Sequence, residues 1–86
     1  MTHRVTITVD NSPGIVKGLI ALLGAPTEQL DDQVAPDGWP QPCIVLRYDY
    51  ETDTEAVLCA MMFSDALAAN SFQYRLTRYL IAHEEV

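Results

Sequence analysis

The sequence has little positive charge. Five Lys and Arg stand against twelve Asp and Glu, which gives a net charge of -7. Binding to nucleic-acid phosphates requires clustered cations, so this shortage argues against direct nucleic-acid binding. Two interpretations of the acidic excess stay open. It keeps a small domain soluble, or an acidic face imitates nucleic acid and occupies a basic groove on another protein.

Long apolar segments are also absent. No run approaches the roughly 18 residues that a membrane-spanning helix needs, and residues 1–4 lead straight into a strand pattern rather than a signal-peptide core. We therefore expect a soluble, cytoplasmic protein that does not bind a membrane.

Cysteine is scarce, and the two that are present, Cys43 and Cys59, are expected to be reduced, buried thiols. A zinc site built from them with His3 and His83 is conceivable from residue types alone. The spacing of the four residues matches no common zinc motif, so we predict no metal site and no cofactor.

An enzyme site is not apparent either. The sequence shows no carboxylate pair for acid–base chemistry, no glycine-rich phosphate loop and no histidine close to a cysteine that it could activate. We expect His3 and His83 at the frayed ends of the chain. The sequence therefore predicts no catalytic residues and a protein that is not an enzyme.

Residues 5–23 predict a strand, a tight turn and a helix. Apolar and polar residues alternate over the strand, with Val5, Ile7 and Val9 on one face. Pro13 suits the first position of the helix, and Ser12 is its expected cap. The apolar face of the helix carries Ile15, Leu19 and Leu22. Gly24 and Pro26 then end the helix.

The middle of the chain is divided by turn residues. Residues 27–35 predict a short edge strand, in which Asp31 and Asp32 discourage further pairing. A proline-rich turn follows, and its Trp39 is either tucked over the sheet edge or displayed as an interface anchor. Residues 43–50 predict a further strand, with one face made of Ile44, Leu46, Tyr48 and Tyr50.

A second helix follows, and Thr52 and Glu55 form a capping box at its start. We expect its wide apolar face to lie in the core, with the members Val57, Leu58, Met61, Met62, Ala66, Leu67 and Ala69. Met61 and Met62 could instead provide an adaptable binding surface.

Residues 72–83 fit two patterns. Phe72, Tyr74 and Leu76 alternate as in a strand, whereas Phe72, Leu76 and Tyr79 keep helical spacing. A final strand beside the first would complete a β-α-β-β-α-β order. We therefore predict a single α+β domain over residues 1–86, ferredoxin-like, with an antiparallel sheet and two helices on one face. The small core of such a domain favours a homodimer.

Residues 9–16, VDNSPGIV, resemble the strand-to-helix turn of ACT domains, and most closely that of the regulatory subunit of acetolactate synthase. The resemblance implies a loop at a subunit contact that binds an amino-acid-like effector. A helix start suits a carboxylate because its N–H groups are unpaired and its dipole is positive there. The predicted ligand-binding residues are Asp10, Asn11, Ser12, Gly14 and Ile15. Asp10 and Asn11 could equally serve only to cap the helix.

Two functions remain. The first is a non-catalytic, ACT-like regulator that binds an amino-acid-like effector at a dimer interface. The second is a stand-alone acidic inhibitor or adaptor that blocks a basic partner surface, of the kind found among small phage proteins such as anti-CRISPRs. For this second function the predicted partner-binding residues are Trp39, Asp49, Glu51 and Asp53.

Overall fold

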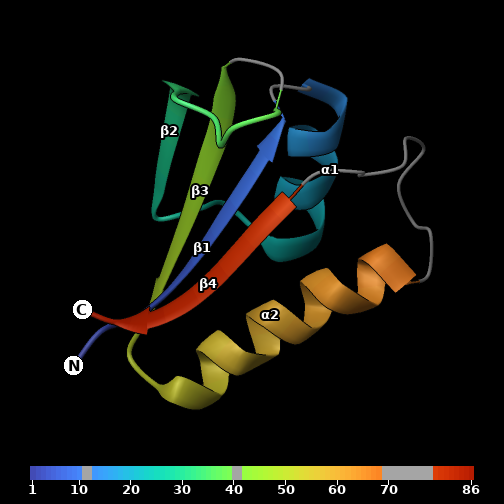
Figure 1. The fold of residues 1–86 in the computed structure, drawn as a ribbon. Coiled ribbons are helices and arrows are strands. Elements are labelled where there is room, and N and C mark those ends of the chain that lie inside the picture. Colours follow the sequence, from blue (N-terminus) through green and yellow to red (C-terminus); the bar gives the residue numbers. More distant parts are fainter. Residues whose placement is uncertain (11–12, 40–41, 69–78) are drawn as a thin grey trace.

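The computed structural model describes residues 1–10, 13–39, 42–68 and 79–86. Its elements are β1 (His3–Asp10), α1 (Pro13–Leu23), β2 (Glu28–Gln33), β3 (Cys43–Tyr50), α2 (Asp53–Ala68) and β4 (Tyr79–Glu85). The strands form one antiparallel sheet in the order β2-β3-β1-β4, and both helices lie on the same face of it (Figure 1). This confirms the predicted α+β, ferredoxin-like arrangement. Neither helix among the described residues is long and apolar enough to cross a membrane.

The core is built on the alternating residues of the two central strands. Val5, Ile7 and Val9 of β1 are fully buried. In the register of the sheet, Val5 pairs with Tyr48 and Ile7 pairs with Leu46, so the apolar faces of β1 and β3 coincide. Period-two alternation sends these side chains to the helix-covered side of the sheet.

Helix α1 follows its prediction, with one difference. Ile15 and Leu19 are buried as expected, but Leu22 is 39% exposed. At 100° per residue, the buried face is centred between Leu19 and Leu23, and Leu22 lies at its margin. The helix ends where predicted: Gly24 has a φ of 89°, and its N–H donates to the carbonyl of Ile20 at 2.8 Å.

Helix α2 buries a different face from the one predicted. Thr52 caps the helix as predicted: its Oγ1 accepts a hydrogen bond from the N–H of Glu55 at 3.2 Å and donates to Glu55 Oε1 at 2.9 Å. The side chains in the core are Ala56, Cys59 and Phe63. Four apolar residues that we expected in the core are at least 40% exposed: Val57, Leu58, Met61 and Met62.

The reason lies in the geometry of the contact. Ala56, Cys59 and Phe63 pack into the core, and the ring of Phe63 lies edge-on to Tyr79 of β4 at 5.5 Å between ring centroids. At 100° per residue, Val57, Leu58 and Met61 then fall on the far side of the helix, and Met62 lies on its flank. The other predicted members, Ala66, Leu67 and Ala69, lie outside what the structure describes of side chains.

Strand β2 is the predicted edge strand, and it contains a bulge. Leu30 pairs with Val45 and Gln33 pairs with Cys43, so Asp31 and Asp32 together face the single residue between them on β3, Ile44. Asp32 has a positive φ of 54°. Aspartate tolerates this left-handed conformation better than most residues, which suits it to the bulge.

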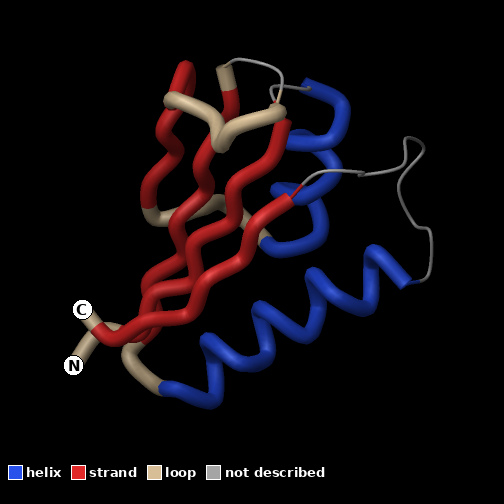
Figure 2. Tube along the Cα trace, viewed as in Figure 1, coloured by secondary structure: helices blue, strands red, loops and turns tan. Residues whose placement is uncertain are grey.

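Strand β4 confirms the predicted final strand from Tyr79 onward; residues 72–78 of that prediction lie outside the described residues. It pairs with β1 along its length (Figure 2). Beyond the strands, Thr2 and Val86 exchange two backbone hydrogen bonds, of 3.3 and 2.9 Å. His3 and His83 therefore lie in paired strands, and the expectation of frayed ends is wrong.

Candidate functional site

The predicted ligand-binding residues divide between the surface and the core. Asp10 ends β1 and is partly buried, and Gly14 is exposed in the first turn of α1. Ile15 is 7% exposed and packs in the hydrophobic core. Asn11 and Ser12 lie outside the described residues. The structure thus leaves Asp10 and Gly14 as the surface members of this set.

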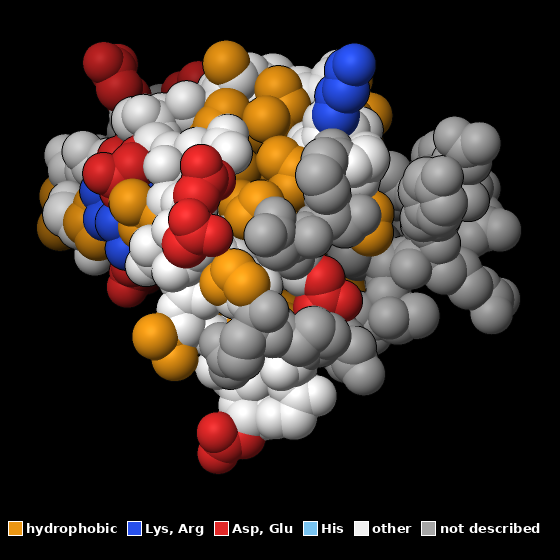
Figure 3. Space-filling model, turned by 90° about the horizontal axis from the view of Figure 1, so that it is seen from above, with side chains coloured by type: hydrophobic (Ala, Val, Ile, Leu, Met, Phe, Trp, Pro, Cys, Tyr) orange, Lys and Arg blue, Asp and Glu red, His pale blue; other side chains and the backbone are white. Residues whose placement is uncertain are grey.

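An open groove lies between α1 and β2, and neither Asp10 nor Gly14 lines it. Its volume is about 490 Å³, which falls within the range of roughly 300–1,000 Å³ typical of small-molecule sites. The lining residues are Val16, Lys17, Ile20, Gln29, Asp31, Asp32 and Ile44. Seen from above, this end of the molecule shows hydrophobic side chains between acidic groups and a basic one (Figure 3).

The groove has an apolar floor and two charged walls of opposite sign. Val16 and Ile44 are almost fully buried and form the floor with Ile20. Lys17 extends from α1 on one side, and the carboxylates of the β2 bulge stand on the other. Among the described residues Lys17 makes no ion pair. The arrangement complements a small zwitterion that carries an apolar group.

The bulge is what builds the acidic wall. In a regular strand, successive side chains point to opposite faces, so Asp31 and Asp32 could not both line one groove. A bulge re-aims one side chain. Asp31 is held further by Gln29 Nε2, which donates to Oδ1 at 2.9 Å, and by Gln33 Nε2, which donates to the backbone carbonyl at 2.9 Å. These bonds hold Asp31 in place, and Asp32 lines the groove beside it.

The predicted partner-binding residues do not form one surface. Trp39 is partly buried in the turn before β3, where its backbone N–H donates to the carbonyl of Pro36 at 3.1 Å. Glu51 and Asp53 are exposed beyond the other end of β3. The strand that separates them spans about 25 Å at 3.4 Å per residue. Asp49 is engaged by Arg4, so its carboxylate is already paired within the chain.

Both thiols are buried and free of disulfides, as predicted. Burial raises the pKa of Cys43 and of Cys59, which keeps each in the protonated, unreactive form. Cys43 donates to the carbonyl of Val34 at one end of β3, whereas Cys59 borders a cavity of about 190 Å³ between the two helices and Tyr50. The two cysteines therefore do not share a zinc site with His3 and His83.

The groove itself was missed by inference from the sequence. The sequence carries no local signal for it, because the bulge at Asp31 and Asp32 is a shift in the register with β3. Comparisons with protein-family models, curated proteins and solved structures find no match. The interpretation of function therefore rests on the geometry of this chain, and the resemblance to ACT domains stays a prediction.

Proposed function

We propose that this protein is a non-catalytic, ACT-like regulatory module that binds a small amino-acid-like effector in the groove between α1 and β2. The observation that carries the proposal is the placement of Lys17 opposite Asp31 and Asp32 across an apolar floor. Lys17 suits the carboxylate of an amino acid, and the aspartates suit its ammonium group. Charge-assisted hydrogen bonds of this kind are stronger than neutral ones.

The floor favours an effector with an apolar side chain. Val16, Ile20 and Ile44 offer only carbon atoms to a ligand, so a branched aliphatic side chain would bury apolar area there. A charged side chain would lose its hydration without finding a partner on the floor. Asp10 and Gly14 do not line the groove, so the proposed site is centred on Lys17, Asp31 and Asp32.

Self-association is part of the proposal. The exposed apolar residues of α2 and α1 would be covered by a second copy of the chain: Leu22, Val57, Leu58, Met61 and Met62. A homodimer built in this way leaves the groove beside β2 accessible. Cytoplasmic location is proposed with it, as the compartment in which buried thiols stay reduced.

The experiment is a thermal-shift screen of the twenty amino acids on the purified protein. We expect a branched-chain amino acid to raise the melting temperature, since a ligand at a hundred times its Kd adds about 2.7 kcal/mol of stability. The matching amine without the carboxylate, and the matching acid without the ammonium group, should give no shift. Both halves of the zwitterion are then required.

A matched pair of variants locates the site. Lys17→Met should abolish the shift, because it removes the positive wall of the groove. Arg47→Met removes the same charge from β3, where Arg47 pairs with Glu28 at 2.6 Å, and should leave the shift unchanged. Equal shifts in the wild type and Lys17→Met, or no shift with any amino acid, would reject the groove as the effector site.

One observation favours the alternative function, an acidic inhibitor or adaptor that covers a basic partner surface. Tyr50 and Glu85 both pair with His3, so the exposed acidic residues that follow β3 and those that end β4 lie at the same end of the sheet. They are Glu51, Asp53, Glu55, Glu84 and Glu85. A protein that ignores all amino acids, but binds a basic partner less well as salt rises and after Glu51→Lys, would fit this alternative.

A further inference from the structure

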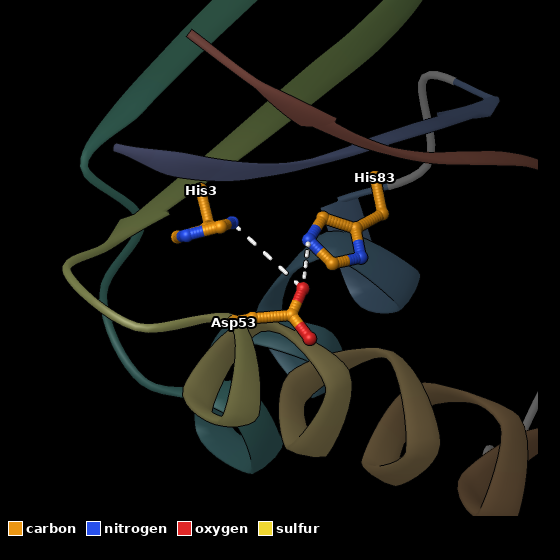
Figure 4. A group of neighbouring side chains, drawn as sticks. All are labelled: His3, Asp53 and His83. Atoms are coloured by element: carbon orange, nitrogen blue, oxygen red, sulfur yellow. Dashed lines mark ion pairs between the residues drawn. The ribbon is translucent and has the colours of Figure 1, made fainter. Parts of the chain in front are cut away.

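Two histidines and an aspartate meet at the end of the sheet opposite the groove. His3 comes from β1, His83 from β4 and Asp53 from the start of α2, and the three side chains point toward one another (Figure 4). Asp53 Oδ1 lies 3.8 Å from His3 Nδ1 and 3.4 Å from His83 Nε2. All three ligand atoms fall within 4.8 Å of one another.

The fold brings these residues together from both ends of the chain. His83 pairs with Val5, and His3 stands two residues before Val5, so both imidazoles leave the sheet on its helix-covered face. Asp53 follows the cap residue Thr52, whose hydrogen bond to Glu55 fixes the first turn of α2 below them. The chain contains no other histidine.

One atom of the cluster has no partner. His3 is 12% exposed, and its Nδ1 is buried without a hydrogen bond. Its distance to Asp53 Oδ1 exceeds the upper limit of roughly 3.2 Å for such a bond. Buried polar atoms are normally satisfied, and one that is not calls for a water or an ion. Nδ1 points toward the carboxylate of Asp53, where a cation would satisfy both groups (Figure 4).

We infer that His3, Asp53 and His83 bind a divalent first-row transition-metal ion such as Zn²⁺. Imidazole nitrogen with one carboxylate oxygen suits zinc and its neighbours, whereas Mg²⁺ and Ca²⁺ take oxygen ligands. With metal–ligand distances near 2.0–2.1 Å, tetrahedral ligands lie roughly 3.3 Å apart. The Asp53–His83 distance already fits. His3 must approach Asp53 by about half an ångström, and its Nδ1 must also close on the His83 nitrogen, which lies within 4.8 Å of it.

The surroundings favour a cation and leave the site open. Glu85 pairs with His3 across the sheet and so leaves the same face, which brings one further negative charge near the cluster. Asp53 is 68% exposed, which gives an ion direct access from solvent. Three protein ligands leave a fourth position for water or for a donor from a bound molecule. The ion would join β1, β4 and α2.

The test is binding of Zn²⁺ to the full chain, measured by equilibrium dialysis and by thermal shift, with Co²⁺ as a spectroscopic probe. We expect one ion per chain, a raised melting temperature, and the visible absorption of Co²⁺ bound to nitrogen and oxygen. Mg²⁺ at the same concentration should give no shift. The variant Cys43→Ala/Cys59→Ala should bind as the wild type does, because neither thiol is a ligand.

Two exposed carboxylates provide a matched comparison. Asp53→Asn should weaken Zn²⁺ binding by at least about tenfold, since even outer-shell partners of metals act in the range of 10–100-fold. Glu51→Gln removes the same charge two residues away and should leave the affinity within about twofold of wild type. His83→Ala should also lose the Co²⁺ absorption while keeping the far-ultraviolet circular dichroism of the fold.

Three results would overturn the inference. They are the absence of stoichiometric Zn²⁺ binding by the wild type, equal losses of affinity in Asp53→Asn and Glu51→Gln, and undiminished Co²⁺ absorption in His83→Ala. Equal losses of affinity would mean that the negative charge of the surface attracts the ion and that Asp53 does not ligate it.

Discussion

The guanidinium of Arg4 forms two hydrogen bonds to the carboxylate of Asp49 across the central strands. Arg4 Nε donates to Oδ1 at 2.8 Å, and Nη2 donates to Oδ2 at 3.1 Å. The two residues are directly paired in the register of β1 and β3. A bidentate contact between partly buried groups is geometrically specific, unlike most surface ion pairs.

This contact predicts an acid-sensitive contribution to stability. The hydrogen bond from Arg4 lowers the pKa of Asp49 below its usual value. A carboxylate whose pKa is depressed in the folded state stabilises the protein above its unfolded pKa of about 3.9, and this stability is lost as the pH falls through the folded value. Urea unfolding at a series of pH values should therefore show a shallower loss of stability below about pH 4 in Asp49→Asn than in the wild type.

The control for this measurement is Asp37→Asn. Asp37 is exposed and makes no ion pair among the described residues. Its substitution should leave the acid limb of the stability profile as it is in the wild type. An unchanged acid limb in Asp49→Asn would contradict the role given to the Arg4 contact.

Tyr48 predicts a loss of stability at the alkaline end. Its hydroxyl donates to the carbonyl of Gly24 at 2.9 Å, and burial raises the pKa of Tyr48 to about 12. A raised folded pKa means that the contribution is complete below the unfolded value of about 10 and is lost as the pH rises toward 12. Tyr48→Phe should cost about 1 kcal/mol at neutral pH and flatten the alkaline decline. Denaturant unfolding from pH 8 upward measures both effects, with the absorbance of tyrosinate as a second readout. If the free energy of unfolding of Tyr48→Phe declines as steeply with pH as that of the wild type, Tyr48 does not have this role.

The face of α2 predicts unequal effects of truncation at two neighbouring positions. Phe63 is fully buried, so Phe63→Ala should reduce the free energy of unfolding by about 3–5 kcal/mol. Met61 is 53% exposed in the single chain, so Met61→Ala should cost about 0.5 kcal/mol or less at protein concentrations low enough to keep the chain monomeric. Chemical denaturation of both variants at one protein concentration checks this. Comparable losses would place Met61, rather than Phe63 alone, in the core.

The bulge predicts unequal effects on stability from two substitutions of Asp32. Glycine accepts a positive φ without cost, so Asp32→Gly should be at least as stable as the wild type. Alanine does not, and Asp32→Ala should be less stable than Asp32→Gly by about 1 kcal/mol. Both variants remove the carboxylate from the groove, so both should weaken effector binding. Thermal unfolding of both variants without ligand measures the backbone strain, and the amino-acid screen then measures effector binding. Equal stabilities of Asp32→Gly and Asp32→Ala would show that the conformation at this position carries no strain.

The strands and the helix starts were predictable because each is encoded within a few residues. The alternation of Val5, Ile7 and Val9 defines a buried strand face locally, and Thr52 with Glu55 defines a helix start. The buried face of α2 was not predictable in this way. Apolar residues occur all around that helix, so the face that packs depends on the shape of the sheet beneath it, where Phe63 fits.

The candidate sites depend on pairings between distant parts of the chain. The β2 bulge exists only in the register with β3, which no local pattern of Asp31 and Asp32 fixes. The histidines meet because β4 pairs with β1. The alternation of side chains along a strand shows that they share a face only after the register of this pair is known. Local sequence patterns therefore predicted the helices and strands, whereas the groove and the histidine cluster depend on strand registers between distant parts of the chain.

The pairing of β1 with β4 also governs the order of folding. The backbone bonds between Thr2 and Val86 close a loop that contains nearly the whole chain. Contacts between residues far apart in sequence carry a large entropic cost and slow folding. We expect the pairing of β1 with β4 to form after the transition state of folding. An ion bound across the two strands would then slow unfolding much more than it would accelerate folding. Such an ion would act chiefly on the lifetime of the folded protein.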